Sequence, residues 1–413
     1  MLPPVLEIFV LWHPRDAVGR DIAEELVAHF RGVSFSGVIG GGIHVSLRST
    51  GWLEDQGAPQ PVYTPLSPGP NGLQPARYVA LVPLLGVELA SNIETEGSWK
   101  GFIENLVKEQ QDVPARVCIF PYLLDRQAVN QTKLGAILSP YQRIATGAPS
   151  KTDDTPKGLR CRDLSQALAQ MLSPSRHERL TVFISHTKRN SESEGPEVQD
   201  LVDLVRSLVG QTHLSEFFDA SDLQPGEDWA QELRAHSARS ALLSIRTDLY
   251  SSREWCQREV AIAKCAGMPV VTLDAIGSGE ERGSFLMDHV PRMPVRKDGA
   301  SWSKQDVLRA LDVLTNECLK RAIWNKQKEV NAADVGTEIA WWAPHAPEPL
   351  TLLHWIEQEG TECPDDRDVV RILHPDPPLG PEEHAFLSRL ARMSKLDCDV
   401  DIMTPRLLAA RGG

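Results

Sequence analysis

The apolar and polar positions between residues 180 and 275 alternate between short strand-like runs and longer helical periods. Runs rich in β-branched and aromatic residues, which are typical of strands, cover 180–186, 216–219, 240–245 and 268–273. Apolar residues at helical spacing follow the first three runs. Strands that alternate with helices at this length predict a doubly wound parallel sheet, which binds ligands beyond the carboxyl ends of its strands.

The same rhythm is present at both ends of the chain. Upstream, strand patterns cover 6–12, 78–84 and 115–120, and a helical pattern runs through Val18, Ile22, Leu26 and Phe30. Downstream, strands are predicted at 338–342, 368–373 and 398–403, with a helix over 381–393. The predicted fold class is therefore α/β, with flavodoxin-like doubly wound parallel sheets and a small C-terminal α/β unit.

Length and charge restrict the class of protein. A chain of 413 residues is long enough for two or three domains. Its 43 basic and 56 acidic residues give a net charge of −13, so we expect no direct nucleic-acid binding. The sequence has no apolar run of about 18 residues and no recognisable signal peptide, so a cytoplasmic protein without membrane attachment is expected.

The cysteines and histidines give no sign of a metal site. The seven cysteines are scattered without a CxxC pair, which indicates reduced thiols. Cys256 is interpreted as a packed thiol, because the nearby Glu259 disfavours a thiolate. The segment HPDPPLGPEE, at 374–383, is interpreted as a turn that leads into a helix, and no metal is predicted there.

One helix start carries a distinctive chemical pattern. In the string SSREWCQREV, at 251–260, Trp255 and Glu259 are four residues apart and share a helix face. An indole and a carboxylate can then offer a stacking surface and a negative charge to one ligand. The same spacing also occurs in ordinary amphipathic helices, in which Trp255 would be a buried anchor.

Four segments in this region resemble, in order, motifs of the TIR (Toll/interleukin-1 receptor) domain. TVFISHTKRN is similar to the family's first strand and following loop, and FFDASDLQPGEDW to its second strand and BB loop. ALLSIRTDLYSSREWCQREV is similar to its fourth strand and catalytic helix, and GMPVVTL to its last strand. The region therefore resembles a bacterial TIR domain of the NAD⁺-cleaving type.

This resemblance implies an enzyme. In NAD⁺-cleaving members the glutamate of the WCxxE string is the catalytic carboxylate, which by motif position is Glu259. The implied activity is an NAD⁺ nucleosidase, with possible ADP-ribosyl cyclase activity, that uses NAD⁺ as substrate and needs no cofactor. Nicotinamide leaves as a neutral ring, and a carboxylate stabilises the oxocarbenium-like ribose that remains. Resemblance to bacterial members also implies anti-phage defence.

The resemblance also implies which residues surround the substrate. Trp255 is expected to form a wall of the pocket, and hydroxyl and cationic groups after the first strand suit pyrophosphate. The substrate-binding candidates are Trp255, Ser185, His186, Lys188, Arg189 and Asp219, although Asp219 could instead cap a turn. The loop around 222–228 is expected to mediate self-association through TIR domains, with Asp222, Leu223, Pro225 and Gly226 as its assembly residues.

The N-terminal region is predicted to be a diverged, non-catalytic TIR-like copy. A helix starts near Trp99, but Ile103 stands four residues later and Glu104 one further, which rotates the carboxylate by about 100°. The predicted domains are a TIR-like domain at 1–144, a linker with a short helix at 145–177, a TIR domain at 178–328, and an α/β unit for sensing or oligomerisation at 329–413.

Two other function classes stay open. Both TIR-like copies could serve as a non-catalytic scaffold for protein–protein signalling, because the fold alone does not decide function. A nucleoside N-glycosidase or deoxyribosyltransferase-like enzyme would instead use a glutamate as nucleophile. The sequence identifies neither the activating ligand or partner protein nor the oligomeric state.

Overall fold

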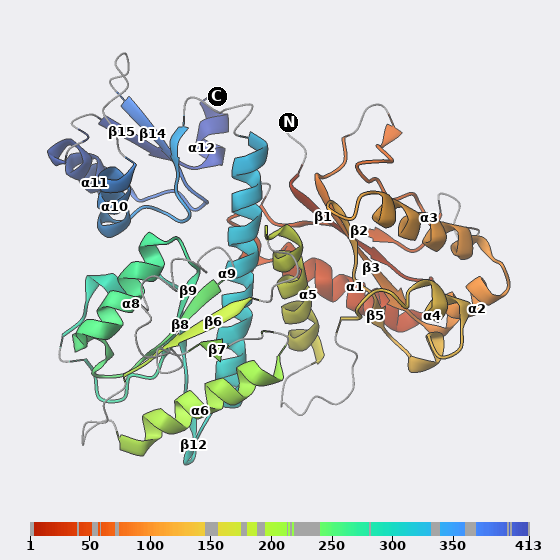
Figure 1. Ribbon diagram of the computed structural model, residues 1–413, viewed down its shortest axis with the longest axis horizontal. Coiled ribbons are helices and arrows are strands. Elements are labelled where there is room, and N and C mark those ends of the chain that lie inside the picture. Colours follow the sequence, from red (N-terminus) through yellow and green to blue (C-terminus); the bar gives the residue numbers. More distant parts are fainter. Residues whose placement is uncertain are drawn as a thin grey trace. The chain divides into compact units, whose positions relative to one another are not determined.

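The computed structural model divides into two compact units, with the boundary along the chain between Leu172 and Ser173 (Figure 1). No helix in the described part of the chain is long and apolar enough to cross a membrane. The structure describes residues 4–38, 41–51, 57, 59–70, 74–144, 156–174, 180–187, 195–212, 214, 217–218, 240–280, 282–331, 339–359, 369–394, 396 and 399–411.

The first unit is built on a parallel sheet with the strand order β2-β1-β3-β4, in which β5 also pairs with β3. All eight residues of the central strand β3 are buried, as expected for a parallel strand covered on both faces. Its strands are β1 (Leu6–Leu11), β2 (His44–Arg48), β3 (Tyr78–Leu85), β4 (Val117–Ile119) and β5 (Tyr122–Leu123). Its α-helices are α1 (Ala17–Phe30), α2 (Val87–Glu94), α3 (Ser98–Asp112), α4 (Lys133–Ile137) and α5 (Pro156–Leu172).

The second unit contains a larger parallel sheet with the order β10-β9-β8-β6-β7. In chain order this is the 2-1-3-4-5 arrangement of flavodoxin-like folds. Helix α8 packs on one face, whereas α9 packs on the other, with α6 beside it (Figure 1). The strands are β6 (Thr181–Ser185), β7 (Phe217–Phe218), β8 (Ser240–Arg246), β9 (Val270–Asp274) and β10 (Arg292–Pro294), and the helices are α6 (Gly195–Gln211), α8 (Glu254–Cys265) and α9 (Lys304–Asn331).

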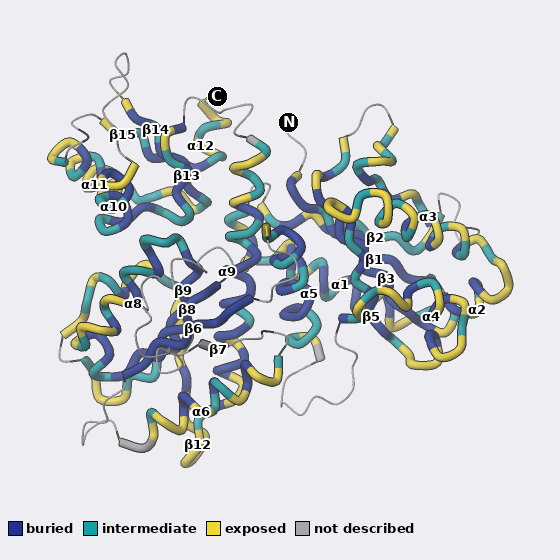
Figure 2. Tube along the Cα trace, viewed as in Figure 1, coloured by how far each residue is buried: buried dark blue, intermediate teal, exposed yellow. Residues whose placement is uncertain are grey.

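The C-terminal part of the second unit has a separate three-stranded parallel sheet, β13-β14-β15. Its own apolar core includes Leu352, Ile372 and Ile402, and Figure 2 shows buried segments in its strands and helices. The elements are β13 (Ile339–Trp342), α10 (Pro349–Gln358), β14 (Val369–Leu373), α11 (Pro381–Met393), β15 (Asp399–Met403) and α12 (Pro405–Ala410). A small antiparallel pair, β11 (Lys297–Asp298) and β12 (Ser301–Trp302), precedes α9.

The observed elements agree closely with the predicted α/β pattern. Each predicted strand of the described chain is present within a few residues, and the predicted helix at 381–393 matches α11. Helix α5 is longer than the helix predicted for the linker, and it belongs to the first unit, where Arg160 forms an ion pair with Glu25. The mixed α/β class with parallel sheets is therefore confirmed, whereas the predicted boundaries of four domains stay predictions.

A buried ion pair joins α8 to the C-terminal sheet region. The ammonium of Lys264 lies 3.0 Å from a carboxylate oxygen of Glu348, and their side chains are 4% and 6% exposed. The same ammonium donates a hydrogen bond to the carbonyl of Asp288 at 2.5 Å. Glu348 is the N-cap residue of α10. Because removing one member of such a pair strands a buried charge, this contact ties α10 firmly to α8.

His345, between β13 and α10, is expected to make stability depend on pH. Burial, together with the positive charges of Arg321 and Lys264, lowers the pKa of His345 to about 4, although hydrogen bonds with the backbone of Ala346 and Lys264 oppose the shift. The unfolded chain therefore binds a proton more readily than the folded chain. The contribution of neutral His345 to the unfolding free energy is fully present above the unfolded pKa of about 6.5. It is lost as the pH falls toward 4, which lowers the unfolding free energy by up to about 3 kcal/mol.

Urea unfolding at a series of pH values checks this expectation. The unfolding free energy of His345→Gln is expected to fall less between pH 6.5 and pH 4 than that of the wild type. An equal fall in both proteins would show that other groups cause the acid sensitivity.

Candidate functional site

The carboxyl ends of β6 and β8 lie side by side at the point where the strand order of the second unit reverses. In doubly wound sheets ligands bind at this switch point. Strand β6 ends at Ser185 and is followed by His186, whereas β8 ends at Arg246 and leads through the short helix at Tyr250–Ser252 into α8. The sheet therefore brings residues from distant parts of the chain to one edge.

A buried hydrogen-bond chain links these elements. The Ser185 hydroxyl donates to a carboxylate oxygen of Glu259, and the Tyr250 hydroxyl lies 2.6 Å from Ser185 Oγ. A serine has one proton to donate, so Tyr250 is the donor in the second bond. Glu259 is 2% exposed, and Ser185 and Tyr250 are also buried. The carboxylate predicted to be catalytic thus lies beside the predicted substrate-binding serine at the switch point.

Tyr250 was missed by the sequence analysis. It is fully buried, and burial raises its pKa well above the usual value, with the nearby charge of Glu259 acting in the same direction. A second hydroxyl pair, Ser244 and Thr272, lies behind it with their oxygens 2.8 Å apart. Tyr250 is therefore a neutral hydrogen-bond donor at physiological pH, and it directs the Ser185 proton toward Glu259.

Trp255 and Glu259 share one side of α8 but differ in environment. The Trp255 side chain is 41% exposed, so it is not the buried anchor of the alternative interpretation. The guanidinium carbon of Arg258 lies 5.8 Å from its ring centroid. An indole with an open face can stack on a planar ligand, and a neighbouring cation suits an anionic one.

His186 and Cys256 connect the first loop to α8 through the backbone. The Cys256 thiol is buried and donates a weak hydrogen bond to the His186 carbonyl, with 3.7 Å between sulfur and oxygen. The His186 ring is also buried, and its Nδ1 lies 3.1 Å from the carbonyl of Thr187. Cys256 therefore has the packed environment predicted for it, and His186 presents little of its ring to solvent.

Several predicted residues lie outside the described part of the chain. The substrate-binding candidates of this group are Lys188, Arg189 and Asp219, and the assembly residues are Asp222, Leu223, Pro225 and Gly226. Their roles stay predictions. Among the described residues, no group of three or more His, Cys, Asp or Glu side chains is placed to hold a metal ion.

A second buried network at the end of β8 was also missed. Arg246 donates through Nε to Glu280 Oε1 at 2.7 Å and through a terminal nitrogen to Oε2, and Ser251 donates to the same carboxylate. Burial raises the pKa of the Glu280 carboxyl, but hydrogen bonds from Arg246 and Ser251 outweigh this effect and keep the pKa below its usual value. A polar residue directly after a strand was the available signal for Arg246, but its partner is 34 residues away.

The first unit has a different environment at the corresponding helix. In α3, Trp99 and Ile103 are 1% and 2% exposed and belong to the apolar core. Glu104 is about half exposed and lies 3.9 Å from Lys100 on the helix surface. Asp16, the N-cap residue of α1, accepts hydrogen bonds from the backbone of Glu88 and Leu89 in the first turn of α2. This helix therefore offers an apolar surface where α8 offers a carboxylate.

Neither the models of known protein families nor the curated proteins compared with the chain match it.

The Arg246–Glu280 pair is expected to be essential for the stability of this edge. The two side chains are 5% and 9% exposed, so either Arg246→Met or Glu280→Leu leaves a buried charge and is expected to cost about 3 kcal/mol. The double variant removes both charges and is expected to cost much less than the two single changes added together. Chemical unfolding of the four proteins measures the coupling, and purely additive effects would contradict it.

Proposed function

We propose that the second unit contains a TIR domain that cleaves NAD⁺ at its N-glycosidic bond and releases nicotinamide. The observation that carries this proposal is the buried Glu259 carboxylate, held by Ser185 at the switch point of a flavodoxin-like sheet. The partly exposed Trp255 one helical turn earlier supports it, because it offers a ring surface beside the carboxylate.

The chemistry follows from the charge that develops on the ribose. When the bond between C1′ and the nicotinamide nitrogen breaks, the electron pair goes to the pyridinium ring, which leaves as neutral nicotinamide. The sugar becomes oxocarbenium-like, and the Glu259 carboxylate stabilises its positive charge. Water then adds to C1′ and loses a proton, which gives ADP-ribose; attack by an adenine nitrogen instead of water gives a cyclic product.

Ser185 and Tyr250 have positioning roles in this proposal. Their hydrogen bonds hold the Glu259 carboxylate in one rotamer before substrate arrives. A ribose hydroxyl can donate to the same carboxylate while Ser185 keeps its bond, because an ionised carboxylate accepts several hydrogen bonds. Such preorganisation reduces the rearrangement needed as charge develops.

The first unit is proposed to be a non-catalytic copy. Its α3 buries Ile103 and exposes Glu104, so it places no carboxylate in a site like that of Glu259. The proposed self-association through the second unit, and the proposed role in anti-phage defence, rest on the TIR resemblance alone.

Replacing Glu259 is expected to abolish activity. Glu259→Gln keeps the shape of the side chain but removes its charge, and nicotinamide release is expected to fall by at least about a hundredfold. Nicotinamide is measured by chromatography with full-length protein at high concentration and with a crowding agent, so that assembly is favoured. The matched control is Glu254→Gln, since Glu254 is an exposed glutamate in the first turn of the same helix.

Activity that survives in Glu259→Gln, or is lost equally in Glu254→Gln, would contradict the proposed role. Trapping of a covalent ribosyl–Glu259 adduct would favour the deoxyribosyltransferase-like alternative, whereas methyl-ADP-ribose formed in methanol would favour the proposed reaction.

Ser185→Ala is expected to lower kcat by roughly tenfold or more while the protein stays folded. The change removes the hydroxyl that donates to Glu259 and accepts from Tyr250, so each of these two buried groups loses one hydrogen bond. Ser252→Ala serves as the control, because Ser252 is exposed just before the same helix. A rise in KM without a change in kcat would assign Ser185 to substrate binding instead of carboxylate positioning.

A further inference from the structure

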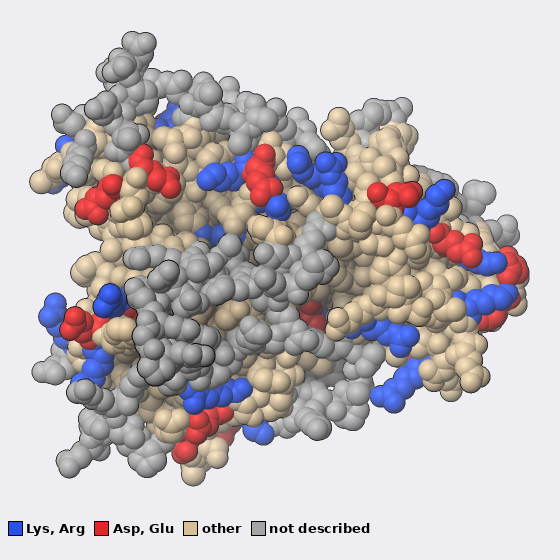
Figure 3. Space-filling model, in the orientation of Figure 1, with Lys and Arg blue, Asp and Glu red and all other residues tan. Residues whose placement is uncertain are grey.

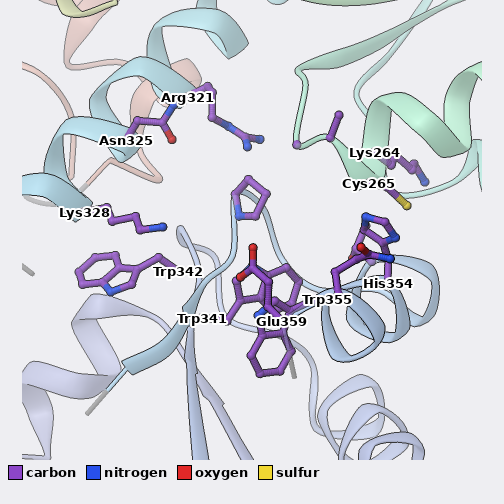
Figure 4. Close-up of a pocket in the computed structure, with 15 residues that line it drawn as sticks. Lys264, Cys265, Arg321, Asn325, Lys328, Trp341, Trp342, His354, Trp355 and Glu359 are labelled. Atoms are coloured by element: carbon purple, nitrogen blue, oxygen red, sulfur yellow. The ribbon is translucent and has the colours of Figure 1, made fainter. Parts of the chain in front are cut away.

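A cavity of about 310 Å³ lies within the second unit, where the C-terminal end of α8 meets α9, β13 and α10 (Figure 4). It is distinct from the Glu259 site, which lies nearer the start of α8. Its volume is at the small end of pockets that hold organic ligands. The lining includes the charged residues Lys264, Arg321, Lys328 and Glu359 and the aromatic residues Trp341, Trp342 and Trp355.

Helix α9 contributes a polar stripe to this cavity. Arg321, Asn325 and Lys328 follow each other at spacings of four and three residues, so they lie on one helix face. In Figure 4 the Arg321 and Lys328 side chains extend from α9 toward the open centre of the cavity. The helix therefore presents two cations and a carboxamide to whatever occupies this space.

Arg321 lacks a counterion in contact. Within the described part of the chain it forms no hydrogen bond or ion pair, and the nearby Glu317 is paired with Lys320. Burial lowers the pKa of Arg321 to about 10, and the charge of Glu317 offsets this only in part. A partly buried cation without a partner is costly, and an anionic ligand would relieve that cost.

The charge of the cavity is opposite to that of the chain. Three of its four charged lining residues are cationic, although the chain has a net charge of −13. Elsewhere, on the face in Figure 3, described residues of both signs are interspersed. Lys264 is already paired with Glu348, so Arg321 and Lys328 are the cations available to a ligand.

Three tryptophans with ordered ring contacts form another part of the cavity wall. Trp341 and Trp355 are stacked with 5.2 Å between ring centroids and 3° between ring planes. Trp342 packs against Trp324, with ring centroids 5.5 Å apart. Aromatic rings that are already ordered can stack on a planar ligand with little further loss of entropy.

We propose that this cavity binds a nucleoside monophosphate. The phosphate would pair with Arg321 and Lys328, since a guanidinium binds phosphate oxygens with two parallel hydrogen bonds. The base would lie against the tryptophan wall, and the carboxamides of Asn325 and Gln358 supply donors and acceptors for its edge. The inference does not depend on NAD⁺ cleavage, because the two sites share no residue.

Isothermal titration calorimetry of the full-length protein tests the proposal with AMP, GMP, CMP and UMP. At least one of the four nucleotides is expected to bind. If AMP binds most tightly, adenosine and inorganic phosphate are each expected to bind at least tenfold more weakly than AMP. Arg321→Gln and Lys328→Glu are each expected to weaken nucleotide binding by about tenfold or more. Lys328 is exposed, so Lys328→Glu is expected to fold normally. It therefore tests the proposal even if Arg321→Gln fails to fold.

Two control variants separate this cavity from other sites. Lys320→Gln changes a cation of α9 that does not line the cavity, and it is expected to bind nucleotide like the wild type. Glu259→Gln is also expected to bind normally. Absence of binding by all four nucleotides, equal binding of inorganic phosphate, or binding that is lost in Glu259→Gln and retained in Lys328→Glu would overturn the proposal.

Discussion

The need to satisfy one buried carboxylate determines how the second unit is organised around its switch point. An ionised group that is removed from water is stable only with close hydrogen-bond partners. Glu259 on α8 meets this requirement through Ser185 at the end of β6, and Tyr250 supports Ser185 from the segment before α8. The position of α8 relative to two neighbouring strands is thereby fixed by polar contacts as well as by the apolar packing of residues such as Val260.

Helix α3 of the first unit and helix α8 of the second unit bury different kinds of side chain against their parallel sheets. In the first unit Trp99 and Ile103 fill the space between α3 and the sheet, so the inner face of that helix is held by apolar burial. Burial of such side chains contributes about 1.5–3 kcal/mol each without any constraint on hydrogen-bond direction. In the second unit a carboxylate, Glu259, occupies a buried position on the helix, so part of this apolar stabilisation is absent and a polar group stands at a defined point. A residue that reduces packing in this way requires an explanation beyond stability, and chemistry at the sheet edge is the one we propose.

Much of this architecture could be predicted from sequence, because strand and helix periods are local properties. The strands around Ser185 and Ile245, and the helix that carries Glu259, were identified by apolar patterning alone. The contacts that build the site are not local. Tyr250 reaches Ser185 across 65 residues, and Arg246 reaches Glu280 across 34, so no spacing rule identifies either pair. The tryptophan wall and the cations of the cavity were missed for the same reason, although the four- and three-residue spacing along α9 was visible in the sequence.

Helix α8 is the physical link between the two sites. Glu259 lies near its middle, and Lys264 lies about 7.5 Å further along the axis, where the helix reaches the cavity. Lys264 is held by Glu348 at the start of α10, so the C-terminal sheet cannot separate from α8 without exposing or stranding a buried charge. A helix of twelve residues does not bend easily between these points. A displacement of α10 large enough to move Lys264 therefore also moves the carboxylate against Ser185, since both residues belong to one rigid element.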